Sequence, residues 1–130
     1  MSKKTSPAPK PPTSEQLALL CAECAANKKA EDIQVLDLRN LVSFADYFVI
    51  CSGTSEPHLK AIANEIQQKL RDEHGAKPNN VDGYPMSQWI VVDYYDVLVH
   101  IFHTDKRAFY SLEDLWSDAP RLELPETVQA

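Results

Sequence analysis

A long amphipathic segment between two strand-like regions limits the folds open to this chain. Apolar residues recur along it at the spacing of one helical face, and they are Leu59, Ile62, Ala63, Ile66 and Leu70. The run Thr54-Ser55-Glu56-Pro57 before it is typical of a helix N-terminus, and Gly75 after it is typical of a helix end. Because a helix of this length between strands implies a crossover connection, the segment predicts an α/β fold.

Shorter elements are predicted on both sides of this helix. Thr13 and Gln16 form a capping box, which begins an amphipathic helix that runs to about Asn27. The predicted strands are rich in β-branched and aromatic residues, and they span residues 32–38, 44–51, 89–92 and 97–102, with an edge strand around Val81. A last helix is predicted for residues 105–116. The predicted fold class is an α/β single-domain sandwich with a mixed β-sheet flanked by helices.

The composition divides the 130 residues into a leader, one domain and a tail. Residues 1–12 hold four of the nine prolines and no aromatic residue, which predicts a disordered leader. Residues 13–121 are enough for one compact domain, and residues 122–130 are predicted to form a loose tail. The sequence contains no run of about 18 apolar residues, and its N-terminus lacks the apolar segment of a secretory signal. We therefore expect a cytoplasmic protein without a membrane span.

The predicted domain is acidic. The net charge of the chain is −6, and three of its 13 basic residues lie in the leader, namely Lys3, Lys4 and Lys10. From Ser14 onward, the chain therefore contains 10 basic residues and all 19 acidic residues, which gives a net charge of −9. Phosphate groups repel a body of this sign. If the target is a ribonucleoprotein, we expect its protein component to supply the contact.

Two pairs of side chains have spacings that suggest metal or redox chemistry. Cys21 and Cys24 would place two thiolates within reach of each other, but they lie mid-helix on its apolar face, which favours a core position. His100 and His103 lie three apart on a predicted strand, so they point to opposite faces and cannot share a metal ion. We expect neither a metal nor a cofactor.

The loop from Ser52 to Ser55 leaves an enzymatic alternative open. It joins a predicted strand to a helix, where backbone amides can bind a phosphate group. The alternative function is a nucleotide-binding or nucleotidyltransferase-like enzyme that uses this loop. The loop matches neither glycine-rich phosphate-binding pattern, and a long helix follows where paired carboxylates for a catalytic metal would be needed. Asp93 and Asp96 are the best candidates for acid-base chemistry, although charged turn residues are usually only solvated.

The predicted hairpin of residues 89–102 has two unlike faces. If its turn is symmetric about Tyr94-Tyr95, the pairs on one face are Trp89 with His100, Val91 with Leu98, and Asp93 with Asp96. The other face is wholly aliphatic and is predicted to lie in the core. The first face combines aromatic anchors with acidic residues, which suits a protein interface, while packing under another helix is the alternative. Tyr94-Tyr95 lacks the Gly or Asn that favours a two-residue turn, so a shifted register stays open.

Several long blocks of this sequence match a known family in the same order. They are ADYFVICSGTS at 45–55 with His58 after it, WIVVDY at 89–94, DVLVHIF at 96–102 and FYSLEDLW at 109–116. Together they resemble the Iojap-like ribosomal silencing factor family, and the resemblance covers about residues 15–121. Several ordered blocks are far more specific than any single motif above.

This resemblance implies a small α/β domain with a nucleotidyltransferase-like topology but without catalytic carboxylates. It implies no catalysis, no cofactor and a homodimer in the free state. It also implies that the chain binds the large ribosomal subunit at ribosomal protein L-fourteen, sterically excludes the small subunit and represses translation under nutrient limitation. The lysines of the leader are expected to add only a minor contact with ribosomal RNA.

The resemblance also assigns partner contacts to individual residues. The matching positions are Trp89 and Tyr94, together with Asp93, His100, Phe102 and Tyr110. Most of them belong to the hairpin face that the residues alone indicate as an interface. Tyr95 stands where the family usually has Gly, so the geometry of the turn is expected to differ there.

Overall fold

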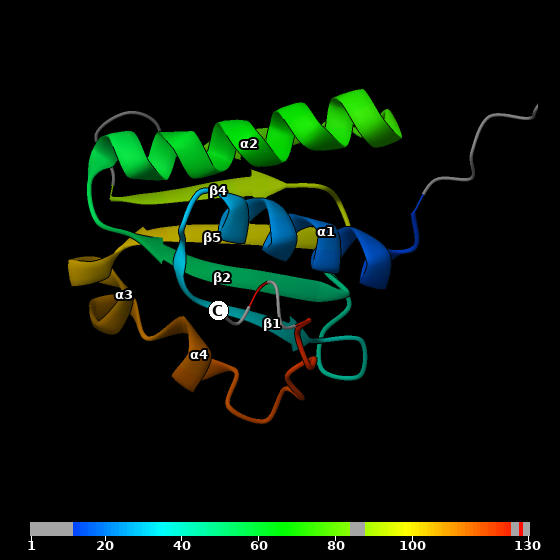
Figure 1. The fold of residues 1–130 in the computed structure, drawn as a ribbon. Coiled ribbons are helices and arrows are strands. Elements are labelled where there is room, and N and C mark those ends of the chain that lie inside the picture. Colours follow the sequence, from blue (N-terminus) through cyan, green and yellow to red (C-terminus); the bar gives the residue numbers. More distant parts are fainter. Residues whose placement is uncertain (1–11, 84–87, 126–127, 129–130) are drawn as a thin grey trace, which may run out of the picture.

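The computed structural model describes residues 12–83, 88–125 and Val128, apart from the side chains of residues 108–110. Its helices are α1 (Ser14–Asn27), α2 (Glu56–His74), α3 (Thr104–Tyr110) and α4 (Leu112–Leu115), and its strands are β1 (Glu31–Asp37), β2 (Tyr47–Gly53), β3 (Asn80–Asp82), β4 (Trp89–Asp93) and β5 (Val97–His103). These strands form one sheet in the order β1-β2-β5-β4-β3, in which β2 and β5 are parallel and the other neighbours are antiparallel. The predicted α/β domain with a mixed sheet flanked by helices is confirmed (Figure 1).

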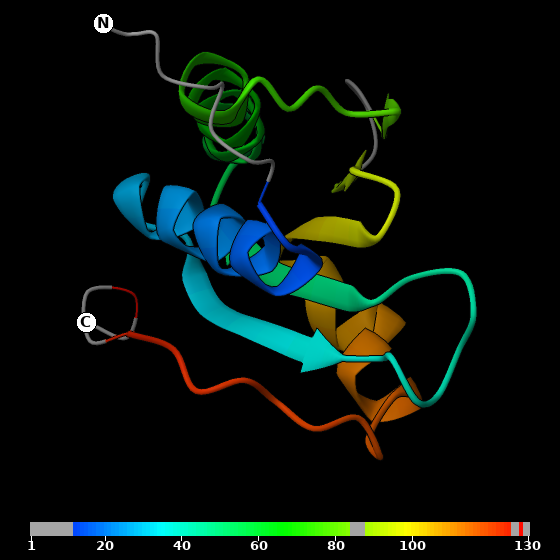
Figure 2. The same ribbon diagram turned by 90° about the vertical axis from the view of Figure 1, so that its right-hand side faces the viewer.

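Helices α1 and α2 lie against the same face of the sheet (Figure 2), and both begin where the sequence predicts. The Thr13 hydroxyl accepts a hydrogen bond from the Gln16 amide, and the Gln16 side chain accepts one from the Thr13 amide. Ser55 caps α2 by accepting from the His58 amide, and Gly75 ends α2 with a φ of 65°. Such caps satisfy groups that a helix end leaves unpaired. None of the helices in the described part of the chain is long and apolar enough to cross a membrane.

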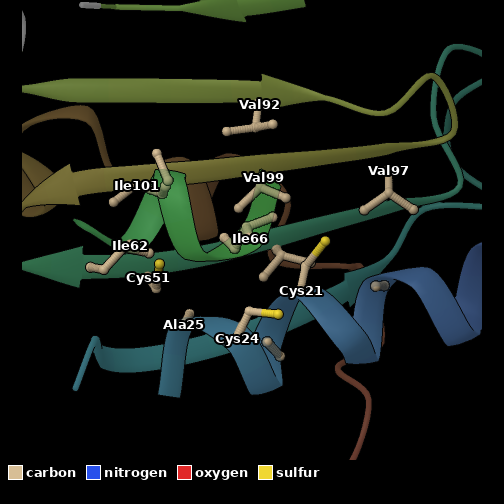
Figure 3. Close-up of a cluster of buried hydrophobic side chains, with 14 of the residues drawn as sticks. Cys21, Cys24, Ala25, Cys51, Ile62, Ile66, Val92, Val97, Val99 and Ile101 are labelled. Carbon is tan, nitrogen blue, oxygen red and sulfur yellow. The ribbon is translucent and has the colours of Figure 1, made fainter. Parts of the chain in front are cut away.

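The main core lies between these two helices and the sheet (Figure 3). It includes the aliphatic face of the hairpin, as predicted, and that face consists of Ile90, Val92, Val97, Val99 and Ile101. All three cysteines are buried, and burial raises the pKa of Cys24 to about 11 and that of Cys51 to about 12. Burial also raises the pKa of Cys21 well above its usual value. Because the thiolate is the reactive form, these buried thiols are inert, and the predicted core position of Cys21 and Cys24 is confirmed.

A second, smaller core covers part of the opposite face of the sheet. Helices α3 and α4 and the loop of residues 38–46 lie on this side (Figure 2). The buried members of the second core are Leu36, Leu38, Ala45, Phe48, Ile50, Phe102 and Ala119. The partly exposed side chains that pack against it are Val42, Trp89, Leu98, Leu112 and Trp116. This side of the sheet is therefore covered only in part.

The prediction of a single helix for residues 105–116 is wrong, because the helix is interrupted at Ser111, which separates α3 from α4. Ser111 has a φ of 46°, which is a left-handed conformation. Its amide donates to the Arg107 carbonyl at 2.9 Å, and its carbonyl accepts from the Leu115 amide at 3.1 Å. The break lets Glu113 reach the side chain of Arg107, with which it forms an ion pair of 3.0 Å. Apolar spacing, on which the prediction rested, does not report such a tertiary contact.

The segment after residue 121 is predicted to be a loose tail, and its first residue, Leu122, is hydrogen-bonded to β1. The Leu122 amide donates to the Val35 carbonyl at 2.9 Å, and the Asp37 amide donates to the Pro120 carbonyl at 2.8 Å. Leu122 and Leu124 also pack against the main core. This pairing covers one edge of the sheet, which would otherwise present unpaired backbone groups. The predicted disordered leader lies, up to residue 11, outside the described residues.

Candidate functional site

The hairpin of β4 and β5 carries most of the predicted partner-binding residues, but its register differs from the prediction. The observed pairs are Trp89 with Phe102, Val91 with His100, and Asp93 with Leu98. The predicted pairs are therefore wrong, by a shift of two residues along one strand. Because side chains alternate between the faces of a strand, a shift of two leaves every side chain on its predicted face.

The turn of the hairpin explains this shift. The Tyr94 amide donates to the Val97 carbonyl at 2.9 Å, so that only Tyr95 and Asp96 form the turn. Tyr95 has a φ of 71°, which is uncommon for a residue other than glycine. The Asp93 carboxylate accepts a hydrogen bond of 2.7 Å from the Tyr95 amide and thereby stabilises the turn. Asp93 and Asp96 are not paired across the strands, so the predicted pair for acid-base chemistry is not assembled.

Ring contacts connect six side chains across the partly covered face of the sheet, and we call this set the aromatic row. Its members are Trp89, Phe102, His100, Phe48, Trp116 and Phe44. The ring centres of Trp89 and Phe102 are 4.9 Å apart in a stacked arrangement, and His100 meets Phe48 edge-on at 4.5 Å. Aromatic pairs in such geometries contribute about 0.5–1.5 kcal/mol each beyond their buried area. The side chains of the row therefore hold one another in place.

The aromatic row is exposed at its ends and buried in its middle. The exposed or partly exposed members are Phe44, Trp89 and Trp116, and the buried members are Phe48, His100 and Phe102. Phe44 is 58% exposed because β2 begins only at Tyr47, three residues later than the predicted strand, and leaves Phe44 in a loop. Val91 and Leu98, on the same face of the sheet, are also partly exposed. An apolar surface of this kind is typical of a protein interface.

A hollow of about 300 Å³ lies beside Trp89. Its walls are Asp82, Gly83, Trp89 and Val91. Asp93, which lies on the same face of the sheet, is partly exposed. An aromatic wall next to the Asp82 carboxylate suits an apolar or cationic side chain of a partner, because a cation is attracted both by the ring face and by the acid.

His100 accepts a hydrogen bond from Trp89 within this surface. The indole Nε1 of Trp89 donates to Nδ1 of His100 at 3.1 Å. Burial lowers the pKa of His100 to about 4, so the ring is neutral near neutral pH. A neutral ring that accepts at Nδ1 carries its proton on Nε2.

The structure divides the six predicted partner-binding residues by their exposure. The partly exposed ones are Trp89 and Asp93, and the buried ones are Tyr94, His100 and Phe102. Tyr110 ends α3, and its side chain lies outside the part that the structure describes. Phe44 and Trp116 were not predicted as contacts, since their place on this surface depends on how the loop and α4 fold over the sheet.

Tyr94 does not share the face of Trp89. It is 5% exposed and packs in the main core, on the side of α1. The reason is that strand alternation continues through Tyr94 to the two-residue turn, which places Tyr94 on the same side as Val92. Its hydroxyl has no hydrogen-bond partner among the described residues, and burial raises its pKa. Tyr94 therefore has a core position in the free chain, and its partner contact stays a prediction.

The loop from Ser52 to Ser55, on which the enzymatic alternative rests, has its hydroxyl groups and the Thr54 amide already hydrogen-bonded. The Thr54 amide donates to Nδ1 of His58 at 2.9 Å, and Nε2 of the same ring lies 2.7 Å from the Lys28 carbonyl and donates to it. Ser55 caps α2, as predicted, and the Ser52 hydroxyl accepts from Arg107 at 2.9 Å. Two amides at this helix N-terminus, those of Thr54 and His58, are thus used for structure.

A cavity of about 420 Å³ lies next to this loop, at the ends of β2 and β5. Its lining is mostly acidic or hydroxylic and consists of Glu31, Asp32, Ser52, Thr104, Arg107, Ser111, Glu113 and Asp114. Its one cationic residue, Arg107, forms ion pairs with Glu113 and Asp32. Carboxylates repel phosphate groups, so this lining does not suit a nucleotide. Among the described residues, no group of three or more His, Cys, Asp or Glu side chains is arranged to hold a metal ion.

Comparison with known sequences gives a consistent set of relatives. A family model described as "Ribosomal silencing factor during starvation" matches residues 11–130. The "Ribosomal silencing factor RsfS" of Halalkalibacterium halodurans is 40% identical over 112 residues, which cover 86% of this chain and 95% of the relative. The protein of the same name from Bacillus subtilis is 43% identical over 105 residues, which cover 81% of this chain and 88% of the relative.

Solved structures with the same fold agree with these relatives. A protein of Chromobacterium violaceum superposes with a TM-score of 0.78 at 30% identity and covers 82% of this chain and 88% of its own. A protein of Bacillus halodurans superposes with a TM-score of 0.73 at 38% identity and covers 85% of this chain and 99% of its own.

Proposed function

This chain belongs to the family of ribosomal silencing factors, and we propose that it silences translation by binding the large ribosomal subunit and preventing the small subunit from joining. In this proposal it docks at ribosomal protein L-fourteen on the intersubunit face, and the block is steric. The chain acts by occupying the surface, without a catalytic step, in the cytoplasm of cells short of nutrients.

The aromatic row is the observation that supports this proposal. It offers a partly exposed tryptophan at one end and a 58% exposed phenylalanine, Phe44, at the other, on a face of the sheet that helices cover only in part. Side chains in the row are held by ring contacts before any partner arrives, so docking costs little ordering entropy. Tryptophan is also the residue that most often dominates the binding energy of an interface.

The charge of the chain favours a protein partner over bare RNA. The net charge from Ser14 onward is −9, and Asp82 lines the hollow beside Trp89. We therefore propose a basic surface of L-fourteen as the docking partner, because opposite charges steer association and fix orientation. Lys3, Lys4 and Lys10 are the part of the chain suited to a minor contact with ribosomal RNA.

Purified subunits provide the test. The chain, carrying an affinity tag, is incubated separately with large and with small subunits, and bound subunits are recovered. We expect the large subunit alone to be retained, because L-fourteen, the proposed docking partner, belongs to that subunit. Equal retention of both subunits, or full retention of large subunits that lack L-fourteen, would contradict the proposal.

We also propose that the free chain is a homodimer that uses the same apolar surface. Phe44 and Leu115 are 58% and 71% exposed, and large exposed apolar patches mark interaction sites. Sedimentation at tens of micromolar should show a dimer, because homodimers with dissociation constants of about 1–10 μM are associated in that range. A monomer at those concentrations would count against it.

A further inference from the structure

His100 has two kinds of contact with the exposed tryptophan of the aromatic row. Its ring lies 5.8 Å from the ring of Trp89, centre to centre, and it receives the indole N–H in a hydrogen bond of 3.1 Å. His100 is itself 6% exposed and meets Phe48 edge-on at 4.5 Å. A buried histidine therefore accepts a hydrogen bond from a side chain that reaches the surface.

The stack and the hydrogen bond restrict Trp89 in different ways. The stack on Phe102, with 26° between the ring planes, fixes the plane of the indole. Stacking alone would allow the indole to be turned over, because either face of the ring can stack on Phe102. The indole nitrogen only donates, and Nδ1 of His100 accepts from it, so the hydrogen bond selects the edge that faces the sheet.

We infer that His100 is a positioning residue for docking, which presets the orientation of Trp89 and does not itself touch the partner. This inference rests on the proposed function and assigns His100 a role other than the direct contact that the sequence predicts. A tryptophan locked before binding loses less rotamer freedom on binding, so the lock contributes to affinity. Without an acceptor at position 100, the indole N–H would lose this hydrogen bond, and with it the preference for one edge of the ring.

Two substitutions test the acceptor nitrogen of His100 and its aromatic ring separately. His100→Phe keeps an aromatic ring against Phe48 and Trp89 but removes the acceptor. His100→Asn removes the ring but places an amide oxygen near the position of Nδ1. If the hydrogen bond matters, affinity for the large subunit should fall about five- to tenfold in His100→Phe and should be largely restored in His100→Asn.

The indole N–H resonance of Trp89 gives a readout that a purely structural role would not change. The sequence has two tryptophans, so the spectrum contains one other indole signal, from Trp116, which serves as the internal control. In wild type the Trp89 signal should be shifted by the hydrogen bond and slow to exchange with water. In His100→Phe it should exchange quickly, while the Trp116 signal and the folded spectrum stay the same.

A double-mutant cycle completes the test. Trp89→Phe removes the donor, so His100→Phe should cause no further loss of affinity in that background. If His100→Phe binds like wild type, or if its effect is undiminished in the Trp89→Phe background, the positioning role is overturned and the proposed function stands. If wild type itself does not bind the large subunit, the proposed function fails and the inference falls with it.

Discussion

Arg107→Met should lower the free energy of unfolding by about 2 kcal/mol, because it removes a buried cation together with its hydrogen bonds and its ion pairs to two less buried carboxylates. Arg107 is 7% exposed, and it forms ion pairs with Glu113 at 3.0 Å and with Asp32 at 3.4 Å. It also donates to the buried Ser52 hydroxyl at 2.9 Å. The substitution would leave Glu113, whose side chain is 20% exposed, without its partner. Methionine fills a similar length, so the loss reports the charge and hydrogen bonds more than a cavity.

Urea denaturation measures this loss, with Arg71→Met as the matched control. The side chains of Arg71 and its partner Asp72 are both more than half exposed, at 57% and 56%, so solvent screens their ion pair. We expect the urea midpoint to fall for Arg107→Met and to stay close to wild type for Arg71→Met. Equal midpoints for the two variants would show that the network around Arg107 does not hold α3 and α4 to the sheet.

Trp89→Ala should weaken binding to the large subunit by about 2 kcal/mol or more, which is roughly thirtyfold. Trp89 combines partial exposure with a fixed orientation, since it stacks on Phe102 and donates to His100. Removing its ring takes away the contact surface and one wall of the hollow lined by Asp82 and Val91. The affinity is measured by titrating labelled large subunits with each variant.

His74→Ala is the control for this prediction, because His74 is exposed at the end of α2, away from the aromatic row. Its affinity should equal that of wild type. Trp89→Ala also loses packing against Phe102, so its folded state is first verified from the dispersed amide spectrum. A folded Trp89→Ala variant with wild-type affinity would show that the aromatic row is not the docking surface.

The helices illustrate what local sequence determines. Thr13 and Gln16, and again Ser55 and Gly75, mark helix ends through hydrogen bonds or backbone conformations that involve only neighbouring residues. These bounds could be predicted because no distant contact is needed to form them. Ser111 is the contrasting case, since its left-handed conformation accompanies the approach of Glu113 to Arg107.

The proposed docking surface could be predicted only in part. The alternation of residues in β4 and β5 assigned each side chain to a face, and that assignment survived a register shift of two residues. It did not reveal that Tyr94 continues the alternation into the main core. Nor did it reveal which residues on the Trp89 face are covered, because Phe102 is buried in a cluster whose members, such as Leu36 and Ala119, come from different parts of the sequence.

The fraction of joined ribosomes is the measurement that tests the central claim most directly. Purified large subunits are incubated with the chain, small subunits are added, and free and joined particles are separated by gradient sedimentation. With wild type in excess, joined ribosomes should largely disappear and free subunits accumulate, whereas Trp89→Ala at the same concentration should leave most ribosomes joined. An unchanged joined fraction with saturating wild type would contradict the claim that this chain silences ribosomes by blocking subunit joining.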